Sequence, residues 1–170
     1  MSRHGAVDPI PYITAVSGAL RQRDQPRAVF AALDHALASV LGHKLFTLLM
    51  YHPDQAQSER CYTNQPIAYP VGGRKPITPS PWTESLFQHH RPYIGHTAED
   101  IREVFPDHEL IASLGCASVL NVPIVWSDRT LGTMNLLHEA HWYDDGDVSI
   151  ARVFAALAVP AFLSLTRPSR

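Results

Sequence analysis

The feature that most constrains the fold of this chain is a hairpin between residues 115 and 137. Two apolar runs flank the short polar segment Ser127–Arg129. The first run carries Ser118 and the pair Val122-Pro123, and the second carries Gly132 near its start. Apolar runs separated by a few turn residues predict two neighbouring antiparallel strands. The chain is therefore expected to contain an antiparallel sheet.

The residues before the hairpin predict two helices and two further strands. Apolar residues recur at helical spacing over 9–20 and over 26–41, and Gly42 supplies a stop after the second helix. The nearly continuous apolar run 45–51 fits a central strand that is covered on both faces. Residues 59–63 predict a second strand.

The segment 64–81 contains five prolines and the pair Gly72-Gly73, so regular structure is not expected there. A long irregular loop inside a compact domain is usually functional or mobile. Beyond it, the pattern predicts a short helix at 82–89, a brief strand at 92–96, and two helical pieces at 99–105 and 107–114.

A final helix is predicted from the acidic segment 144–147 to about Thr166, with Pro160 either kinking it or leaving one carbonyl unpaired. Its apolar residues cover more than one face, so the helix should bury a second surface. Two arrangements remain open. The surface is a dimer contact that also involves the helix at 12–20, or that first helix of the same chain covers it.

The order of these elements indicates an α+β domain with a central antiparallel sheet of five to six strands. The hairpin resembles the C-terminal hairpin of GAF domains, which are small-molecule sensing modules of regulatory proteins. The resemblance extends over about residues 26–163. It implies a GAF/PAS-like fold, with the terminal helices on one sheet face and a roof of loops and short helices on the other. We expect one domain at 9–170 after a disordered tail at 1–8.

Composition narrows the possible partners. The formal net charge is −2 and no basic run exceeds two residues, so a nucleic-acid partner is not expected. The N-terminus lacks the apolar core of a signal peptide, and the apolar stretch 150–165 is short and interrupted, so no membrane partner is expected. Two cysteines do not indicate a disulfide framework. These features predict a cytoplasmic protein.

The resemblance implies that a ligand lies between the sheet and the roof, which we define as residues 64–114. Alternation along the hairpin strands places Val119 with Asn121 on one face, and Thr133 with Asn135 on one face. A buried amide needs a partner, which is either a polar ligand or neighbouring protein groups. The roof aromatics either line a pocket or form the core beneath the roof. The candidate ligand-binding residues are Tyr69, Trp82, His89, His96, Val119, Asn121, Thr133 and Asn135.

One enzymatic branch of the family, the free methionine-(R)-sulfoxide reductases, provides the alternative function. These enzymes use a roof cysteine and carboxylates on the hairpin strands, but the matching positions here are Ala112, Val119, Asn135 and Leu137. None of these residues can act as a carboxylic acid. Cys61 and Cys116 are expected on strands too far apart for a disulfide.

The sequence lacks the motifs that are typical of other ligand classes. The Asn-Lys-Phe-Asp-Glu set of cyclic-nucleotide-binding members and the Asp-Ile-Pro motif of bilin-binding members do not occur. Ten histidines raise the question of a metal or of a haem held by His89 or His96, but their spacing does not predict a metal site. The sequence therefore favours a sensory, ligand-binding protein that forms a homodimer through its first and last helices. The identity of the ligand or cofactor is left open.

Overall fold

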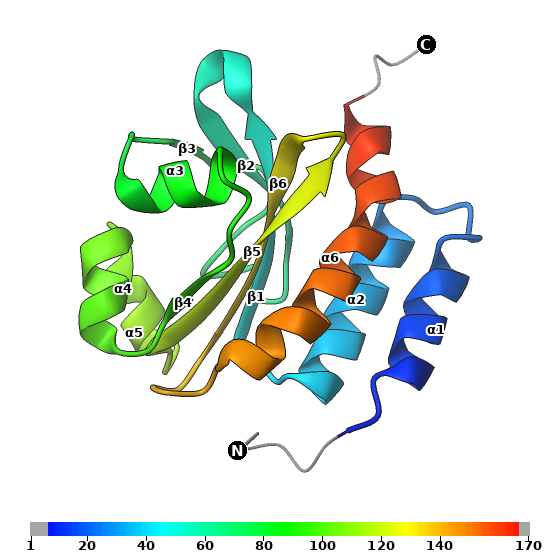
Figure 1. Ribbon diagram of the computed structural model, residues 1–170, viewed down its shortest axis with the longest axis horizontal. Helices are drawn as coiled ribbons and strands as arrows, with labels where there is room; N and C mark the ends of the chain where they lie inside the picture. The colour runs from blue at the N-terminus through cyan, green and yellow to red at the C-terminus, as the bar shows by residue number, and fades with distance from the viewer. Residues whose placement is uncertain (1–6, 167–170) are drawn as a thin grey trace.

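A six-stranded antiparallel sheet lies between two layers of helices in the computed structural model, which describes residues 7–166 (Figure 1). This arrangement confirms the predicted α+β class. The strands are β1 (Leu45–His52), β2 (Gln57–Thr63), β3 (Arg74–Pro76), β4 (Tyr93–Gly95), β5 (Ser118–Trp126) and β6 (Arg129–His138).

The helices divide between the two faces of the sheet. The helices are α1 (Ile10–Ala19), α2 (Arg27–Val40), α3 (Pro81–Phe87), α4 (Ala98–Val104), α5 (His108–Ser113) and α6 (Asp145–Leu165), and a single 3-10 turn, η1, covers Pro53–Gln55. The layer α1, α2 and α6 lies on one side, and α3, α4 and α5 belong to the roof on the other side (Figure 1).

The strands follow the order β3-β2-β1-β6-β5-β4. Strands β1 and β6 are therefore the two central strands, and β5 lies between β6 and the edge strand β4. The turn residues of the β5–β6 hairpin, Ser127 and Asp128, both have positive φ, at 49° and 58°. Two successive positive-φ residues make a tight turn whose twist matches that of the strands it joins.

The main core lies between the sheet and the terminal helices. Leu120, Val122 and Ile124 of β5 are fully buried on this side, as strand alternation predicts. They pack with aromatic side chains such as Phe154 and Phe162 of α6. The opposite face of the hairpin, which carries Asn121, is thereby turned toward the roof.

The last helix is covered only in part by the rest of the chain. The first helix packs along α2 and also contacts α6, which is one of the two predicted arrangements. Val153 and Leu165 of α6 nevertheless remain exposed. Within residues 7–166, α6 is the one helix that is long enough and apolar enough to cross a membrane. The core helix of a globular domain can have the same length and composition. Pro160 lies inside this helix without ending it.

The prediction that residues 64–81 contain no regular structure is wrong at one point. Arg74–Pro76 forms β3, which pairs with the start of β2. This strand lies at the edge of the sheet, where a proline is tolerated because one side of the strand needs no partner. The tail predicted at 1–8 falls largely outside the described residues, as do the last four residues of the predicted domain.

Candidate functional site

A cavity of about 520 Å³ lies between the sheet and the roof. This volume falls within the range of pockets that hold small organic molecules. Strands β1, β2, β5 and β6 supply its floor, and β3, α3 and the segments around α4 and α5 supply its walls. Its lining residues are Leu45, Thr47, Leu49, Ser58, Arg60, Tyr69, Lys75, Pro76, Thr78, Trp82, Leu86, Phe87, Val104, Phe105, Pro106, Asp107, Ile111, Asn121, Thr133, Asn135 and Leu137.

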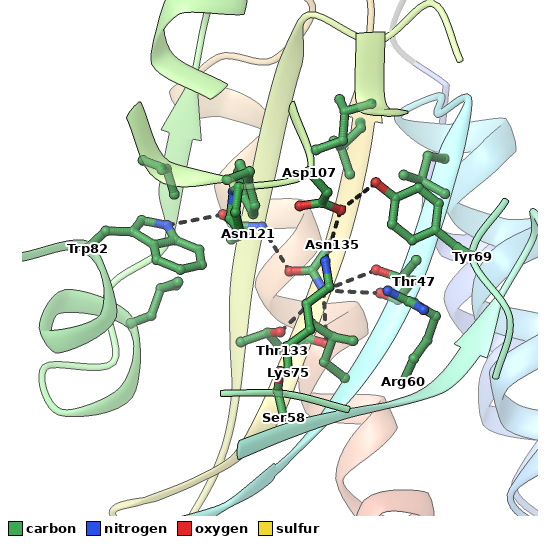
Figure 2. Close-up of a pocket in the computed structure, with 18 of the residues that line it drawn as sticks. Thr47, Ser58, Arg60, Tyr69, Lys75, Trp82, Asp107, Asn121, Thr133 and Asn135 are labelled. Carbon is green, nitrogen blue, oxygen red and sulfur yellow. Dashed lines mark hydrogen bonds and ion pairs between the residues drawn. The ribbon is translucent and has the colours of Figure 1, made fainter. Parts of the chain in front are cut away.

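A row of hydrogen-bonded side chains crosses the floor of the cavity. Asn121, Asn135 and Thr47 lie directly opposite one another on β5, β6 and β1. Asn121 Nδ2 donates to Asn135 Oδ1 at 2.8 Å, and Asn135 Nδ2 lies 3.3 Å from Thr47 Oγ1 and 3.2 Å from Thr133 Oγ1. At the other end, Trp82 Nε1 donates to Asn121 Oδ1 at 3.3 Å. Figure 2 shows this row running from the roof to β1.

The two buried amides therefore find their partners within the protein. Neighbouring protein groups satisfy Asn121 and Asn135, and both side chains still line the cavity, so their contact with a ligand stays a prediction. A side chain that is already held in one orientation can position a polar guest without a further loss of conformational entropy on binding.

Charged and phenolic side chains gather at the end of the cavity next to β2. Asp107 Oδ2 accepts a hydrogen bond from the Tyr69 hydroxyl at 2.6 Å and lies 2.9 Å from Lys75 Nζ. Arg60 lies with its guanidinium 4.7 Å from the centre of the Tyr69 ring and donates to the Pro70 carbonyl at 3.0 Å. Figure 2 shows Tyr69 and Arg60 on the side opposite Trp82, with Asp107 and Lys75 between.

A β-bulge turns Arg60 into the cavity. The register between β1 and β2 shifts between Leu48 and Leu49, so that Leu48 faces Tyr62 while Leu49 faces Arg60. Cys61 is the extra residue of the bulge. As a result Tyr62 packs on the helix side against Phe30, while Arg60 lies on the roof side. Strict alternation would have placed residues 60 and 62 on the same face.

Burial and hydrogen bonding set the ionisation of this end. Burial by itself raises the pKa of Asp107, but the hydrogen bonds from Tyr69 and Lys75 outweigh it and hold the pKa below its ordinary value. Burial, followed by the hydrogen bond to Asp107, raises the pKa of the Tyr69 hydroxyl well above its usual range. Burial also lowers the pKa of Arg60, although a guanidinium remains charged. The end therefore carries two cations and one anion.

The other end of the cavity is apolar and aromatic. Trp82 meets Phe105 edge to face, with ring centres 5.2 Å apart. Phe87 of α3 also lines the cavity, as does the buried Leu86. This end offers contact surface for an apolar or planar group.

The structure brings five of the eight predicted site residues to the cavity. These residues are Tyr69, Trp82, Asn121, Thr133 and Asn135. The other three are placed elsewhere. Val119 is fully buried in the small core beneath the roof, His89 is exposed beside Glu84, and His96 is exposed beside His141. The two histidines follow the short elements α3 and β4, and neither side chain lines the cavity.

Sequence reasoning missed the charged residues of the cavity. Arg60 belongs to a predicted strand. A charged residue within that strand was the one sequence feature that could have indicated a polar site on the sheet. Lys75 and Asp107 lie in roof segments whose relative positions depend on the tertiary fold. No local pattern in the sequence identifies them.

Neither cysteine belongs to the cavity. Cys61 lies in the bulge on the helix side and Cys116 lies in the small core beneath the roof. Burial raises the pKa of Cys61 to about 12 and that of Cys116 to about 11. Both thiols are therefore poor nucleophiles at neutral pH.

Metal ligands do not cluster in the part of the chain that the structure describes. Between residues 7 and 166, no group of three or more His, Cys, Asp or Glu side chains is arranged to hold a metal ion. Among residues 7–166, Asp107 is the one carboxylate that lines the cavity, and it already pairs with Lys75.

Comparison with known proteins gives one family match. The sequence model described as the GAF domain matches residues 26–161. No curated protein shows significant sequence similarity to this chain.

Several solved structures share the fold at low sequence identity. The phycocyanobilin-bound GAF domain of a cyanobacterial phytochrome is 16% identical, with a TM-score of 0.73, and the match covers 93% of this chain and 96% of that one. The GAF domain of a phosphoenolpyruvate-protein phosphotransferase from Coxiella burnetii is 13% identical, with a TM-score of 0.74 and coverages of 95% and 96%. A segment of a methyl-accepting chemotaxis protein is 19% identical, with a TM-score of 0.69 and coverages of 91% and 98%.

Proposed function

The chain belongs to the GAF domain family, and from this membership and its cavity we propose that it is a cytoplasmic sensor of a small organic molecule. The single observation that carries the proposal is a cavity with an aromatic end, a pre-ordered amide row and a partly buried charged end. Such a cavity provides both contact area and orientation for a guest.

The proposed signal begins in the roof. Asp107, Lys75 and Tyr69 link the segment before α5, strand β3 and the loop after β2. A guest that contacts these side chains changes how the three segments are held together. Since β5 and β6 form the floor of the cavity and carry α6 on their other face, the guest reaches the terminal helices through the sheet.

The output of this sensor is proposed to be a homodimer contact through α1 and α6. The exposed apolar residues Val153 on α6 and Ile10 on α1 support this proposal. Apolar side chains on the outer helix layer are suited to a contact between two copies of the chain.

Thermal-shift screening of the purified protein against metabolites tests the proposed function. A ligand that binds only the folded state raises the melting temperature, by an amount that grows with its concentration. We expect at least one hit whose shift is abolished by Trp82→Ala and retained by the control Trp126→Ala, which alters an exposed tryptophan at the far end of β5. A broad library without any hit would contradict the proposal.

The reductase alternative is not supported by the cavity. It would need a reactive thiol and a proton-donating carboxylic acid at the guest, whereas both cysteines lie outside the cavity and Asp107 is held ionised. One relative is described as phycocyanobilin-bound. For this chain the position of the cysteines argues against covalent attachment of any such chromophore to the cavity wall.

A further inference from the structure

We propose that the ligand of this cavity is a small monocarboxylic acid, whose carboxylate pairs with Arg60 and whose apolar body extends toward Trp82. The inference rests on the proposed function and names the chemical class of its ligand. It comes from the unequal pairing of the three charged groups at the β2 end of the cavity.

Arg60 is almost fully buried and is poorly satisfied. The residue is 7% exposed, and among the described residues its guanidinium makes one hydrogen bond, from Nη1 to the Pro70 carbonyl. Its Nε is buried without a partner. A guanidinium has five N–H donors, so most of the donors of Arg60 have no acceptor among residues 7–166. A buried charge in this condition is costly unless an acceptor is supplied.

The carboxylate of Asp107 does not provide the missing acceptor for Arg60. Asp107 Oδ2 takes both the Tyr69 hydroxyl and Lys75 Nζ, so its charge is matched by Lys75. Within the described part of the chain, no carboxylate lies within ion-pair distance of Arg60. The local charge of Arg60, Lys75 and Asp107 together is therefore +1, and a single negative charge on the guest would balance it.

The position of Arg60 indicates a carboxylate at one end of an elongated guest. Arg60 lies on β2 and its guanidinium points into the cavity, while Trp82 lies over β5 (Figure 2). From β2 to β5 the sheet crosses three strand spacings, which is roughly 14 Å. A planar guanidinium pairs with a carboxylate through two parallel hydrogen bonds. The aromatic end accepts the apolar remainder.

The second unpartnered atom supports the same orientation. Asp107 Oδ1 is buried and has no hydrogen-bond partner. The Tyr69 side chain lies between Asp107 and Arg60, because its hydroxyl donates to Asp107 and its ring faces the guanidinium of Arg60. A hydroxyl group next to the guest carboxylate would therefore donate to Asp107 Oδ1. Hydroxy acids are therefore expected to bind more tightly than the corresponding unsubstituted acids.

The test compares acids with their neutral counterparts. The purified full chain is screened by thermal shift and then by isothermal titration against a library of aryl and alkyl monocarboxylic acids, including 4-phenylbutyrate, indole-3-butyrate and octanoate. Each acid is paired with its primary amide, and phenyl phosphate is included as a dianion. We expect several acids to bind at least tenfold more tightly than their amides and phenyl phosphate to bind more weakly than the acids.

Three variants assign the effect to Arg60. Arg60→Met is expected to weaken acid binding at least tenfold while leaving amide binding unchanged, and Arg60→Lys to restore part of the difference. The control Arg74→Met alters an exposed arginine that pairs with Glu59 and is expected to bind like the parent. Without ligand, Arg60→Met is expected to melt at or above the parent temperature, because it removes a buried, poorly paired charge. A much lower melting temperature would assign Arg60 a structural role at the Pro70 loop and overturn the inference.

The outcomes separate this inference from the proposed function. Equal binding of acids and amides, or binding of neutral compounds alone, would overturn the inference and leave small-molecule sensing intact. Absence of binding by every compound of the acid library and of the metabolite screen would overturn both.

Discussion

Single residues decide how tightly the sheet, the helices and the roof approach one another. Gly132 of β6 and Asn135, three positions later, have opposite roles in this respect. The backbone at Gly132 is so close to β1 and α6 that no side chain fits, whereas Asn135 fills its space with hydrogen bonds to three neighbours. Each role leads to a measurable consequence.

Replacement of Gly132 by alanine is expected to destabilise the domain by more than about 3 kcal/mol. An added Cβ would meet the Leu49 carbonyl oxygen and a ring carbon of Phe162 well inside contact distance. Urea unfolding measures the effect. The control Gly18→Ala, in α1 with open space around the new Cβ, should be neutral or stabilising by up to about 1 kcal/mol. Equal stability of the two variants would show that the sheet does not approach α6 as described.

The amide pair provides a second prediction at this scale. Asn135→Leu leaves the Nδ2 donor of Asn121 without its acceptor, and should cost about 1–3 kcal/mol. The double variant Asn121→Leu with Asn135→Leu removes both partners, so its cost should fall below the sum of the two single costs by at least about 0.5 kcal/mol. A double-mutant cycle in urea measures the coupling. Simple additivity would mean that the two amides do not interact.

At the scale of elements, the helix layer and the roof are held by different means. The starts of α3, α4 and α6 are all capped, but α6 alone among them has a long apolar face. The roof elements are short, and α4 and α5 have six or seven residues each. Helices of that length are not stable by themselves, so the roof depends on side-chain ties and on the sheet beneath it.

Loss of the cap of α6 is expected to be measurable. Asp144 Oδ1 accepts from the backbone N–H groups of Gly146 and Asp147 at 2.8 and 3.3 Å, and Asp147 returns a bond to the Asp144 N–H. Asp144→Ala should cost about 1 kcal/mol, while Asp144→Asn keeps a capping oxygen and should cost only a few tenths. Thermal unfolding compares the two. An asparagine variant as unstable as the alanine variant would rule out the hydrogen-bonded cap as the source of the effect.

The roof tie at Asp107 predicts a dependence on pH. Because the pKa of Asp107 is lower in the folded protein than in the unfolded chain, its contribution to stability is fully present above about pH 4 and is lost as the pH falls through the folded-state pKa. Asp107→Asn should therefore flatten part of the loss of stability that occurs as the pH falls from about 4 to about 2. Melting curves over this range test it, with Asp54→Asn, an exposed acid of η1, as control. Parallel curves for the parent and Asp107→Asn would contradict the tie.

For the whole molecule, the sheet separates two sides with different properties. One side is a continuous core of aliphatic and aromatic side chains, and the other holds the cavity. Every strand that forms the cavity floor also carries core residues on its reverse. A guest in the cavity is thus separated from the outer helices by the sheet alone, and the proposed signal has to pass through this sheet.

The proposed homodimer is tested at this scale. Val153→Glu places a charge on the exposed apolar part of α6 and should shift the protein toward the monomer, by more than the control Gln88→Glu, which alters an exposed residue of the roof. Sedimentation velocity over a concentration series measures the association. A parent protein that stays monomeric at all concentrations would remove the dimer from the proposed function, without affecting the cavity.

The sequence alone was sufficient for the features that depend on local periodicity. Alternation in β5 placed Leu120 and Val122 on one face and Asn121 on the other, because successive side chains of a strand point to opposite sides. The hairpin and the helix-forming segments could be identified for the same reason. In the candidate site, Asn121, Asn135 and Trp82 could be predicted from the sequence as lining residues.

The charged end of the cavity was decided only by the tertiary structure. Arg60 reaches the roof side because a bulge interrupts alternation, and a bulge depends on how β2 pairs with β1 rather than on β2 itself. Lys75 and Asp107 meet because two irregular segments of the roof fold against each other over the sheet. Contacts between residues so far apart in the chain arise from the packing of the whole domain, and no local pattern encodes them.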